Sequence, residues 1–258
     1  MTERCGGLVI VGTGIQLGRD VTERVVSEIR HAEVVLALVD PWAGQWLQRL
    51  RPDAISLMSH YAPDRDRRDS YAAMVADILD PVRAGRRVCA VFYGHPAVFA
   101  DVPHDAARAA VAEGHAVRIL PAVSAEACLY ADLGLDPGAN GVISIEATQF
   151  LTEQRVLDPC SLVLLWQVAL AGSLDCKGFE PSPQRLQVLV GKLTRWYRPD
   201  HEVILYEAAR LAIEPFRAER IRLGELPGAR FCEYTTLVIP PAARPAPDRE
   251  IIEALRAQ

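Results

Sequence analysis

The 258-residue sequence has little of what defines several common protein classes. Its six cysteines are scattered, with no Cys-x-x-Cys pair and no histidine at zinc-finger spacing, which argues against a disulfide framework and against a metal site. No uncharged stretch approaches the ~20 residues that a membrane helix needs, and the N-terminus lacks a basic region followed by a long apolar run. We therefore expect a reduced, cytoplasmic protein with no membrane partner.

Concentrated charge of one sign is also missing. The chain carries 28 basic and 33 acidic residues, a formal net charge of -5, and the two signs are interspersed. Without a basic stripe to follow phosphates, nucleic acid is not expected as a partner. Half of the residues are hydrophobic, so a chain of this length can bury a large core and would most simply form two domains.

Apolar runs alternate with helical patterns in the first half of the chain. We expect strands at residues 7–11, 34–39, 87–92 and 116–120, and helices at 22–31, 67–83 and 104–113. Asp20 and Glu23 are expected to cap the first helix, and the Asp40-Pro41 stop to open an irregular stretch. Because parallel strands need helical crossovers, this order predicts an α/β fold with a mostly parallel sheet covered on both faces.

The second half predicts a second, mixed sheet with shorter connections. Apolar runs indicate strands at residues 161–168, 201–206, 221–223 and 235–239, and prolines flank a helix at 183–197. A proline-rich linker precedes a short amphipathic segment at 249–256. We expect an N-terminal α/β domain at 1–122, a C-terminal α/β domain at 123–241, and a linker with a tail helix at 242–258.

A glycine turn, Gly12-Thr13-Gly14, follows the first strand, and Asp40 closes the second. This resembles the start of a nicotinamide-binding fingerprint, in which a helix begins at the glycines and points its N-terminus at a pyrophosphate. Here residues 15–21 intervene before the helix, and the third small residue is misplaced. The turn is therefore expected to be structural or to line a substrate.

A second turn follows the third strand, in the segment Val91-Phe92-Tyr93-Gly94-His95-Pro96-Ala97-Val98-Phe99. Glycine lets the chain bend without a Cβ clash and proline fixes φ, so main-chain groups between aromatic residues become available to a ligand. An ordinary strand-to-helix loop would have the same spacing. The residues alone leave both interpretations open.

This loop, the segment Leu8–Gly14 and the segment Leu120–Glu126 resemble the tetrapyrrole methylase family of S-adenosylmethionine-dependent methyltransferases. Within the family the chain is most similar to the borosin branch, which methylates backbone amide nitrogens of a ribosomally made peptide. The likeness runs from Leu8 to about Pro241. It includes Tyr93–Pro96, Ser124–Glu126, Ala131–Pro137, Glu146–Thr148, Trp166–Val168 and Thr235–Pro241. Ordinary tetrapyrrole methylases usually have an acidic residue where His95 stands.

The resemblance implies a two-domain fold with S-adenosylmethionine bound in the interdomain cleft and S-adenosylhomocysteine as product. It assigns one wall of the cofactor site to the loop after the third strand, the carboxylate or amino end to a helix start, and the adenosine part to two segments of the second domain. The implied cofactor residues are Tyr93, His95, Val98, Phe99, Ser124, Ala125, Trp166, Gln167, Thr235 and Thr236. We expect His95 to shape its loop by donating to a backbone carbonyl.

The acceptor chemistry requires a base and a group that stabilises oxygen charge, because an amide nitrogen lone pair is delocalised into its carbonyl. With Asp66 as helix cap, Arg67 and Tyr71 share one face, and the guanidinium should lower the Tyr71 pKa. The resemblance gives this pair proton removal and oxygen polarisation, with help from Tyr61. It also gives Tyr93 a hydrogen bond to the acceptor carbonyl or a role in orienting the methyl donor.

Two observations count against the assignment of these catalytic roles. Without the resemblance, the arginines and aspartates of residues 64–69 would be interpreted as a solvated charged loop. The relatives that the chain resembles also have a tyrosine three residues before the position of Tyr61, where this chain has Met58, so their detailed proton route is not carried over to this sequence.

Fused borosin enzymes carry their substrate as a long C-terminal extension, whereas residues 249–258 here are charged and helical in pattern. We expect a split enzyme acting on a separate precursor peptide, as a homodimer or as a heterotetramer with two precursor chains. Trp42, Trp46 and Leu50 are candidate interface anchors, with core packing an equal explanation. The alternative functions are C-methylation of a tetrapyrrole such as a precorrin, and cofactor binding without turnover.

Overall fold

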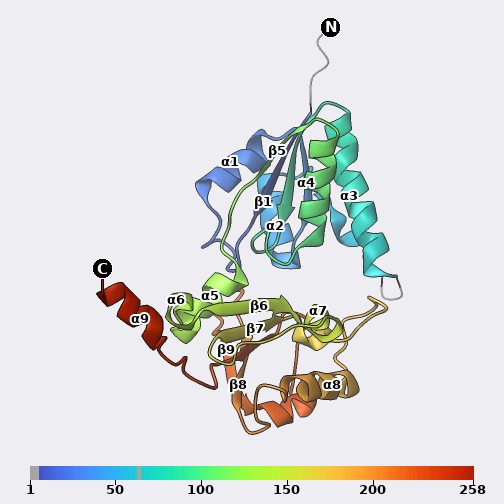
Figure 1. The fold of residues 1–258 in the computed structure, drawn as a ribbon. Coiled ribbons are helices and arrows are strands. Elements are labelled where there is room, and N and C mark those ends of the chain that lie inside the picture. Colours follow the sequence, from blue (N-terminus) through green and yellow to red (C-terminus); the bar gives the residue numbers. More distant parts are fainter. Residues whose placement is uncertain (1–5, 63–64) are drawn as a thin grey trace. The chain divides into compact units, whose positions relative to one another are not determined.

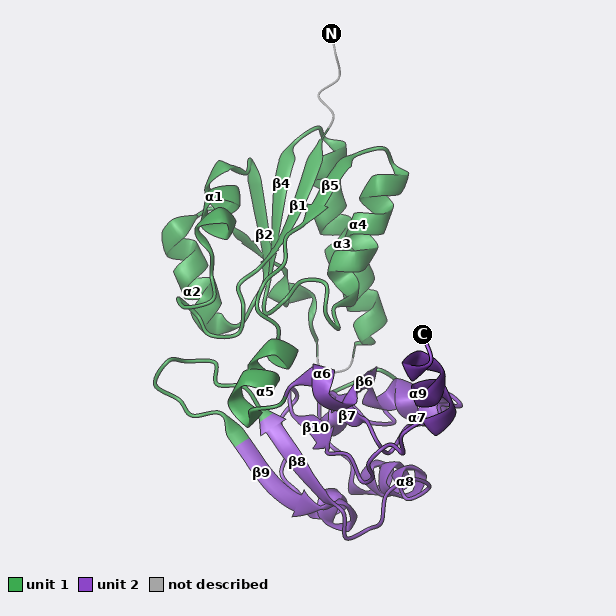
Figure 2. Ribbon diagram, turned by 60° about the vertical axis from the view of Figure 1, so that its left-hand side comes forward, with its two compact units in different colours: residues 1–135, 174–178, 207–217 green, residues 136–173, 179–206, 218–258 purple. Residues whose placement is uncertain are grey.

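The computed structural model describes residues 6–62 and 65–258 (Figure 1). Contacts divide the chain into two compact units, each with its own sheet (Figure 2). Unit 1 comprises Met1–Leu135, Leu174–Gly178 and Glu207–Arg217, and unit 2 comprises Asp136–Ser173, Phe179–Tyr206 and Ala218–Gln258. The functional division expected at residue 122 stays a proposal, since these units are defined by packing alone.

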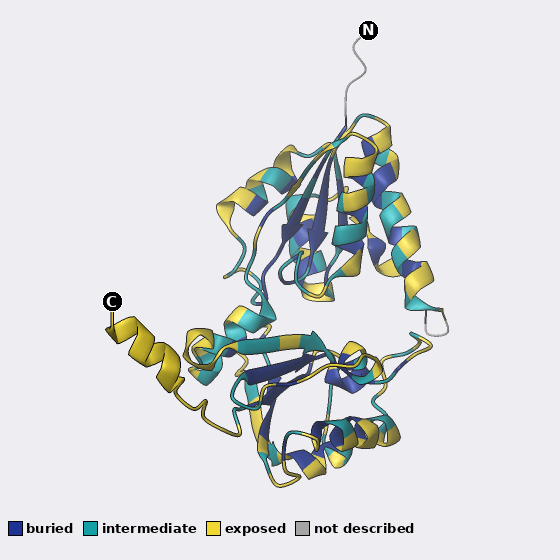
Figure 3. Cartoon of the chain, viewed as in Figure 1, coloured by how far each residue is buried: buried dark blue, intermediate teal, exposed yellow. Residues whose placement is uncertain are grey.

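Unit 1 is built on a five-stranded sheet of order β3-β2-β4-β1-β5, in which every pairing is parallel. Its strands are β1 (Gly7–Gly12), β2 (Val34–Leu38), β3 (Ile55–Ser56), β4 (Arg87–Phe92) and β5 (Ala116–Ile119). The central strands consist of apolar runs buried on both faces (Figure 3), as a sheet covered by helices on two sides requires. The predicted parallel α/β sheet is confirmed.

Four helices cover this sheet in two pairs (Figure 2). On one face, α1 (Glu23–His31) and α2 (Pro41–Leu50) pack against alternate residues of the central strands. On the other face lie α3 (Arg67–Arg83) and α4 (Asp101–Ala112). The short α5 (Ala125–Leu133) follows β5.

The irregular stretch expected after Asp40-Pro41 is wrong, because these residues start α2. Asp40 Oδ1 accepts hydrogen bonds from the backbone N–H groups of Trp42 and Ala43, at 2.9 and 3.1 Å. Pro41 occupies the first helical turn, where a missing N–H costs nothing. Of the candidate interface anchors, Trp46 and Leu50 pack against the unit 1 core and Trp42 is 58% exposed.

The cap of α1 also differs from the expectation. Thr22, not Asp20, is the N-cap, and its side chain accepts from the Val25 N–H. Asp20 Oδ2 instead accepts from the N–H groups of Ile15 and Gln16, at 2.9 and 2.8 Å. The carboxylate therefore closes the glycine turn rather than the helix.

Unit 2 contains a mixed sheet of order β6-β7-β10-β8-β9, as predicted. Its strands are β6 (Val142–Glu146), β7 (Leu162–Trp166), β8 (Glu202–Glu207), β9 (Arg217–Arg222) and β10 (Thr236–Ile239). The β6–β7 pairing is parallel, and β10 runs antiparallel to both β7 and β8. Strand β6 was not predicted, and β9 begins earlier than the apolar pattern indicated.

The helices of unit 2 are α6 (Pro137–Asn140), α7 (Ala147–Thr152), α8 (Pro183–Leu193) and the tail helix α9 (Arg249–Arg256). Short 3₁₀ helices are η1 (Leu57–His60) in unit 1, and η2 (Val168–Leu170) and η3 (Leu223–Gly228) in unit 2. The α9 helix has no buried residue (Figure 3). Within the described parts of the chain, no helix combines the length and apolar character needed to cross a bilayer.

Tyr197, in the unit 2 core, gives a prediction about stability. The residue is 2% exposed, and its hydroxyl has no hydrogen-bond partner among the described residues. Burial raises its pKa to about 12. Ionising this phenol costs more in the folded state than in the unfolded state, where its pKa is about 10. The free energy of unfolding therefore does not depend on this group below pH ~10 and falls as the pH rises toward 12.

We therefore expect Tyr197→Phe to raise the free energy of unfolding at neutral pH by about 1 kcal/mol, since an unsatisfied buried hydroxyl is removed. The variant should also lose less stability above pH ~10. Urea unfolding at neutral and alkaline pH measures both effects. Tyr130→Phe is the control, because that hydroxyl donates to Glu126 Oε1 at 2.6 Å and its removal should destabilise the protein. A less stable Tyr197→Phe variant contradicts the prediction.

Candidate active site

The topology of unit 1 marks the carboxyl ends of its strands as a candidate ligand site. The neighbouring strands β1 and β4 connect onward to α1 and α4, which lie on opposite faces. At such a switch point the two loops separate and leave room at the carboxyl ends of the strands, which is where ligands of open α/β sheets bind. The loops concerned are the glycine turn and the segment after Phe92.

These two loops are joined by main-chain hydrogen bonds. Gly14 and Gly94 exchange N–H···O bonds of 3.2 and 3.0 Å, and both have positive φ, at +70° and +68°. A Cβ on Gly12 would lie 2.1 Å from the Gly94 carbonyl oxygen and 2.7 Å from Pro96 Cδ. The glycines of the turn are thus needed for close packing of the two loops, and α1 begins only at Glu23, so the turn does not open a helix.

His95 fixes the loop after β4. Its Nδ1 accepts a hydrogen bond from the Ala97 N–H at 3.0 Å, and burial lowers its pKa. The ring therefore shapes the loop by accepting this N–H, and a hydrogen bond with the backbone of His95 itself acts on the pKa against burial. The expected donation to a carbonyl stays a prediction. Val98 is half-buried, and Phe99 is 45% exposed.

Ser124 and Ala125 lie at the start of α5. Ser124 is the N-cap, and its Oγ accepts from the Ala127 N–H at 3.1 Å. Both residues are half-buried, at the end of the loop that follows β5. They therefore belong to the same carboxyl edge of the sheet as Tyr93, whose N–H donates to the Leu38 carbonyl of β2 at 3.1 Å.

The candidate acceptor residues meet at the first turn of α3. Asp66 caps the helix, Arg67 and Tyr71 follow one turn apart, and the Tyr61 ring packs edge-on against the Tyr71 ring. The ring centroids are 6.3 Å apart with an interplanar angle of 83°. The structure thus brings three of the four predicted catalytic side chains together.

Arg67 is held from a distant part of the chain. Its N–H donates to the Cys176 carbonyl at 3.2 Å, and its Nη1 donates to the Gly178 carbonyl at 2.6 Å. Its neighbour Arg68 is exposed and pairs with Asp66 at 2.5 Å. The arginines of this segment therefore differ in exposure: Arg65 and Arg68 are exposed, as in a solvated charged loop, whereas Arg67 is half-buried. Pro63 and Asp64 lie outside the described residues.

The expected lowering of the Tyr71 pKa is wrong in sign. Burial raises this pKa and outweighs hydrogen bonding with Tyr61 and the positive charge of Arg67, both of which lower it. The guanidinium acts in the expected direction, but the phenol is packed against the unit 1 core. Met58 is 45% exposed on η1.

The candidate cofactor residues of unit 2 form a second group. Trp166 ends β7 and is buried, with its indole Nε1 donating to Ser144 Oγ at 2.8 Å. Gln167 is exposed, and the next residue, Val168, donates its N–H to the Thr235 carbonyl at 3.3 Å. Thr235 and Thr236 are buried where β10 begins beside β7. The structure therefore brings these four residues together within unit 2.

Backbone strain coincides with the candidate residues. Among the described residues, those other than glycine with a positive φ are Phe99 at 49°, Gln167 at 53° and Cys176 at 52°. The first two belong to the expected cofactor set, and the third contacts Arg67. Because such conformations cost energy and gather at functional sites, this distribution supports the assignment independently of sequence similarity.

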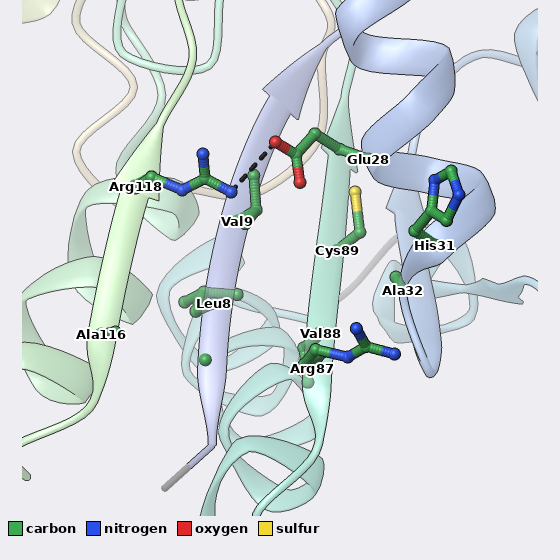
Figure 4. Close-up of a pocket in the computed structure, with 11 residues that line it drawn as sticks. Leu8, Val9, Glu28, His31, Ala32, Arg87, Val88, Cys89, Ala116 and Arg118 are labelled. Atoms are coloured by element: carbon green, nitrogen blue, oxygen red, sulfur yellow. Dashed lines mark hydrogen bonds and ion pairs between the residues drawn. The ribbon is translucent and has the colours of Figure 1, made fainter.

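A cavity of about 330 Å³ lies at the opposite, amino-terminal end of the unit 1 sheet. Figure 4 shows the ion pair between Glu28 of α1 and Arg118 of β5, which spans β1 at a distance of 3.0 Å. Val9 and Cys89 are among the other residues that line the cavity. Arg87 at its rim is paired with Glu33. Both guanidiniums are thus neutralised by carboxylates, and no candidate residue lines this cavity.

Sequence reasoning missed the groups that hold the candidate side chains. Cys176 and Gly178 act through carbonyl oxygens, which every residue possesses, so no sequence pattern marks them. His60 Nε2 pairs with Asp77 Oδ2 at 2.7 Å, and Ser70 Oγ donates to the His60 carbonyl at 2.9 Å. The seven-residue spacing of Ser70 and Asp77, two turns of one helix face, was the available clue.

Comparison with known families agrees with this fold. Residues 7–219 match the family model described as tetrapyrrole (corrin/porphyrin) methylases. The chain therefore belongs to the tetrapyrrole methylase family.

Within the family, relatives place the chain beside borosin enzymes. It is 35% identical over 97% of its length to a methyltransferase/ribosomally synthesized cyclic peptide dendrothelin A precursor from Dendrothele bispora, and it spans 61% of that protein. It is 36% identical over 98% of its length to a methyltransferase/ribosomally synthesized type I borosin cyclic peptide precursor from Coprinopsis marcescibilis, of which it spans 67%. The predicted resemblance to the borosin branch is confirmed.

Solved structures show the same fold at low identity. The uroporphyrin-III-C-methyltransferase of Thermus thermophilus superposes with a TM-score of 0.62 and 19% identity, covering 92% of each chain. At this identity the similarity establishes the fold alone.

Proposed function

We propose that this protein is an S-adenosylmethionine-dependent methyltransferase that methylates backbone amide nitrogens of a ribosomally made peptide. The observation that carries the proposal is the cluster of Tyr61, Arg67 and Tyr71 at the start of α3. The similarity to borosin precursors, which extends over nearly the whole chain, supports it.

The cluster suits an unreactive nucleophile. Removing the amide proton places negative charge on the carbonyl oxygen, so the reaction needs a base at the nitrogen and a cation or donor at the oxygen. Tyr71 would take the proton, with Tyr61 hydrogen-bonded to it. A guanidinium has five N–H donors, so Arg67 can serve the Gly178 carbonyl and a substrate oxygen together.

The residues present fit a cofactor such as S-adenosylmethionine, which supplies an electrophilic methyl group on a sulfonium. In unit 1, the loop from Tyr93 to Phe99 and the capped start of α5 offer main-chain groups, an aromatic ring and a helix N-terminus. In unit 2, exposed Gln167 stands beside Thr235 and can read a base edge. Use of both groups by one cofactor is part of the proposal, as is the contact of Tyr93 with the acceptor.

Mass spectrometry of peptides co-expressed with the protein tests the proposal. Peptides rich in small and β-branched residues should gain one or more methyl masses, localised to backbone nitrogens by fragmentation. Methylated corrinoids with unchanged peptides would instead establish tetrapyrrole methylation, and binding of S-adenosylmethionine without either product would establish a binding module. A substrate peptide on a separate chain and a dimeric assembly are further parts of the proposal, measured by the mass of the purified complex.

The direction of the Tyr71 pKa predicts the pH dependence of transfer. Because burial holds this pKa above its ordinary value of about 10, the phenolate fraction should rise with pH throughout the neutral and mildly alkaline range. Single-turnover rates should therefore increase about tenfold per pH unit with no plateau below pH ~9. Arg67→Met should move the rise to higher pH, since its charge lowers the Tyr71 pKa.

Arg68→Met is the control for that substitution. Arg68 precedes Ser70 on the same helix turn but is exposed and paired with Asp66, so its removal should leave the profile in place. A bell-shaped profile centred near neutrality in the wild-type protein would exclude Tyr71 as the base.

A further inference from the structure

We propose that Asp77 and Ser70 are positioning residues that hold Tyr61 against Tyr71 through His60. This inference rests on the proposed function for its kinetic consequence. It adds to that function a set of three residues that do not touch the reacting groups yet set their geometry.

His60 is the residue directly before Tyr61, and α3 holds it twice. Its imidazole Nε2 lies 2.7 Å from Asp77 Oδ2, and its carbonyl oxygen accepts a hydrogen bond from Ser70 Oγ at 2.9 Å. One contact fixes the side chain and the other fixes the peptide unit that leads into Tyr61. Together they restrain the backbone at Tyr61 more than either would alone.

The two anchoring residues share one face of α3. Ser70 and Asp77 are seven residues apart, and Met74 lies between them on the same face, fully buried. Ser70 itself is 1% exposed, so its hydroxyl bond to the His60 carbonyl forms away from water. Leu57, at the start of η1, is fully buried as well, which holds the other end of this turn.

The consequence is that one helix sets the position of both tyrosine rings. Tyr71 follows Ser70 on α3, and Tyr61 follows the residue that Ser70 and Asp77 hold. Their rings meet edge-on, a geometry that aromatic pairs favour, and the side chains are hydrogen-bonded. Releasing His60 would let η1 move relative to α3 and would disturb this pair without removing either phenol.

A double-mutant cycle tests the coupling. We expect Asp77→Ala in the full chain to lower the single-turnover rate of peptide methylation about tenfold, with affinity for S-adenosylmethionine unchanged within about twofold. Combined with Tyr61→Phe, the same substitution should cause little further loss, because its effect passes through Tyr61. Asp77→Glu, which can still reach His60, should retain most of the rate.

Asp80→Ala is the matched control, because Asp80 lies one turn further along α3 with its side chain 73% exposed and pairs only loosely with Arg83, at 3.5 Å. It should leave the rate unchanged. Equal slowing by Asp77→Ala in the wild-type and Tyr61→Phe backgrounds would overturn the proposal.

Fluorine NMR provides a readout that does not depend on catalysis. In protein carrying fluorotyrosine at its seven tyrosines, the Tyr61 and Tyr71 signals are assigned by their loss in the phenylalanine variants. Asp77→Ala and Ser70→Ala should shift these two signals and leave the others in place, whereas Asp80→Ala should shift none. If both signals stay unmoved, the positioning role is excluded. If the signals move but the wild-type protein methylates no peptide, the proposed function fails and the positioning role stands.

Discussion

Tyr71→Phe should retain cofactor binding and lose methyl transfer, with a single-turnover rate at least about 100-fold below that of the wild-type protein. The substitution keeps the ring that packs against Tyr61 and the unit 1 core, so folding should be preserved. It removes the only atom of the side chain that can take a proton. Isothermal titration with S-adenosylhomocysteine and single-turnover transfer to the peptide measure the two properties separately.

Tyr197→Phe is the matched control for this substitution. It removes the same atom from another buried tyrosine, in the unit 2 core, which has no part in the candidate site. Its transfer rate should equal that of the wild-type protein. A Tyr71→Phe variant with normal turnover would remove Tyr71 as the base and leave Tyr61 or Tyr93 to be tested in its place.

Gly12→Ala should destabilise the protein by about 3 kcal/mol, a large effect for one added methyl group. The reason is space rather than φ: the new Cβ would meet the Gly94 carbonyl oxygen at 2.1 Å and Ala122 Cβ at 2.8 Å. Backbone atoms cannot rotate out of the way, so the loops after β1 and β4 must separate. Affinity for S-adenosylhomocysteine should fall with stability, because Tyr93 and His95 lie on the displaced loop.

Gly44→Ala, the same substitution at another glycine, should change the free energy of unfolding in the opposite direction. Gly44 lies inside α2, and nothing approaches its added Cβ within 4 Å. Alanine is the better helix former, so this variant should be more stable by roughly 1 kcal/mol. Urea unfolding of both variants decides the matter, and equal stability of Gly12→Ala and wild type would contradict the packing described for the turn.

The elements that the sequence predicted well are those with long, uniform patterns. Strand β4 and helix α3 have the predicted bounds, because a buried apolar run and a seventeen-residue helical pattern each leave little choice. Helix α2 was missed because the pair Asp40-Pro41 was interpreted only as the end of the preceding strand. The same pair also caps and starts a helix. Strand β9, with the sequence RAERIR, has four charged residues of six, so the apolar pattern marked only its last part.

The candidate site likewise has features that the sequence predicted and features that it did not. The spacing of Arg67 and Tyr71 specified that they share a helix face, and the structure places them so. The sign of the Tyr71 pKa was not predictable, because burial by distant residues outweighs a neighbouring charge that the sequence does show. The anchoring of His60 by Asp77 and Ser70 depends on how η1 packs on α3, which neither segment specifies alone.

The hydrogen bond from Arg67 to Gly178 joins residues 111 positions apart in the chain. During synthesis, α3 emerges long before the segment that holds its arginine, and the first part of unit 2, Asp136–Ser173, is translated in between. A truncated protein that stops after α5 would contain Tyr61, Arg67 and Tyr71 yet lack the carbonyl that orients the guanidinium. Competence for proton removal would then arise late in folding, so an isolated N-terminal fragment should make a poor starting point for engineering peptide-modifying catalysts.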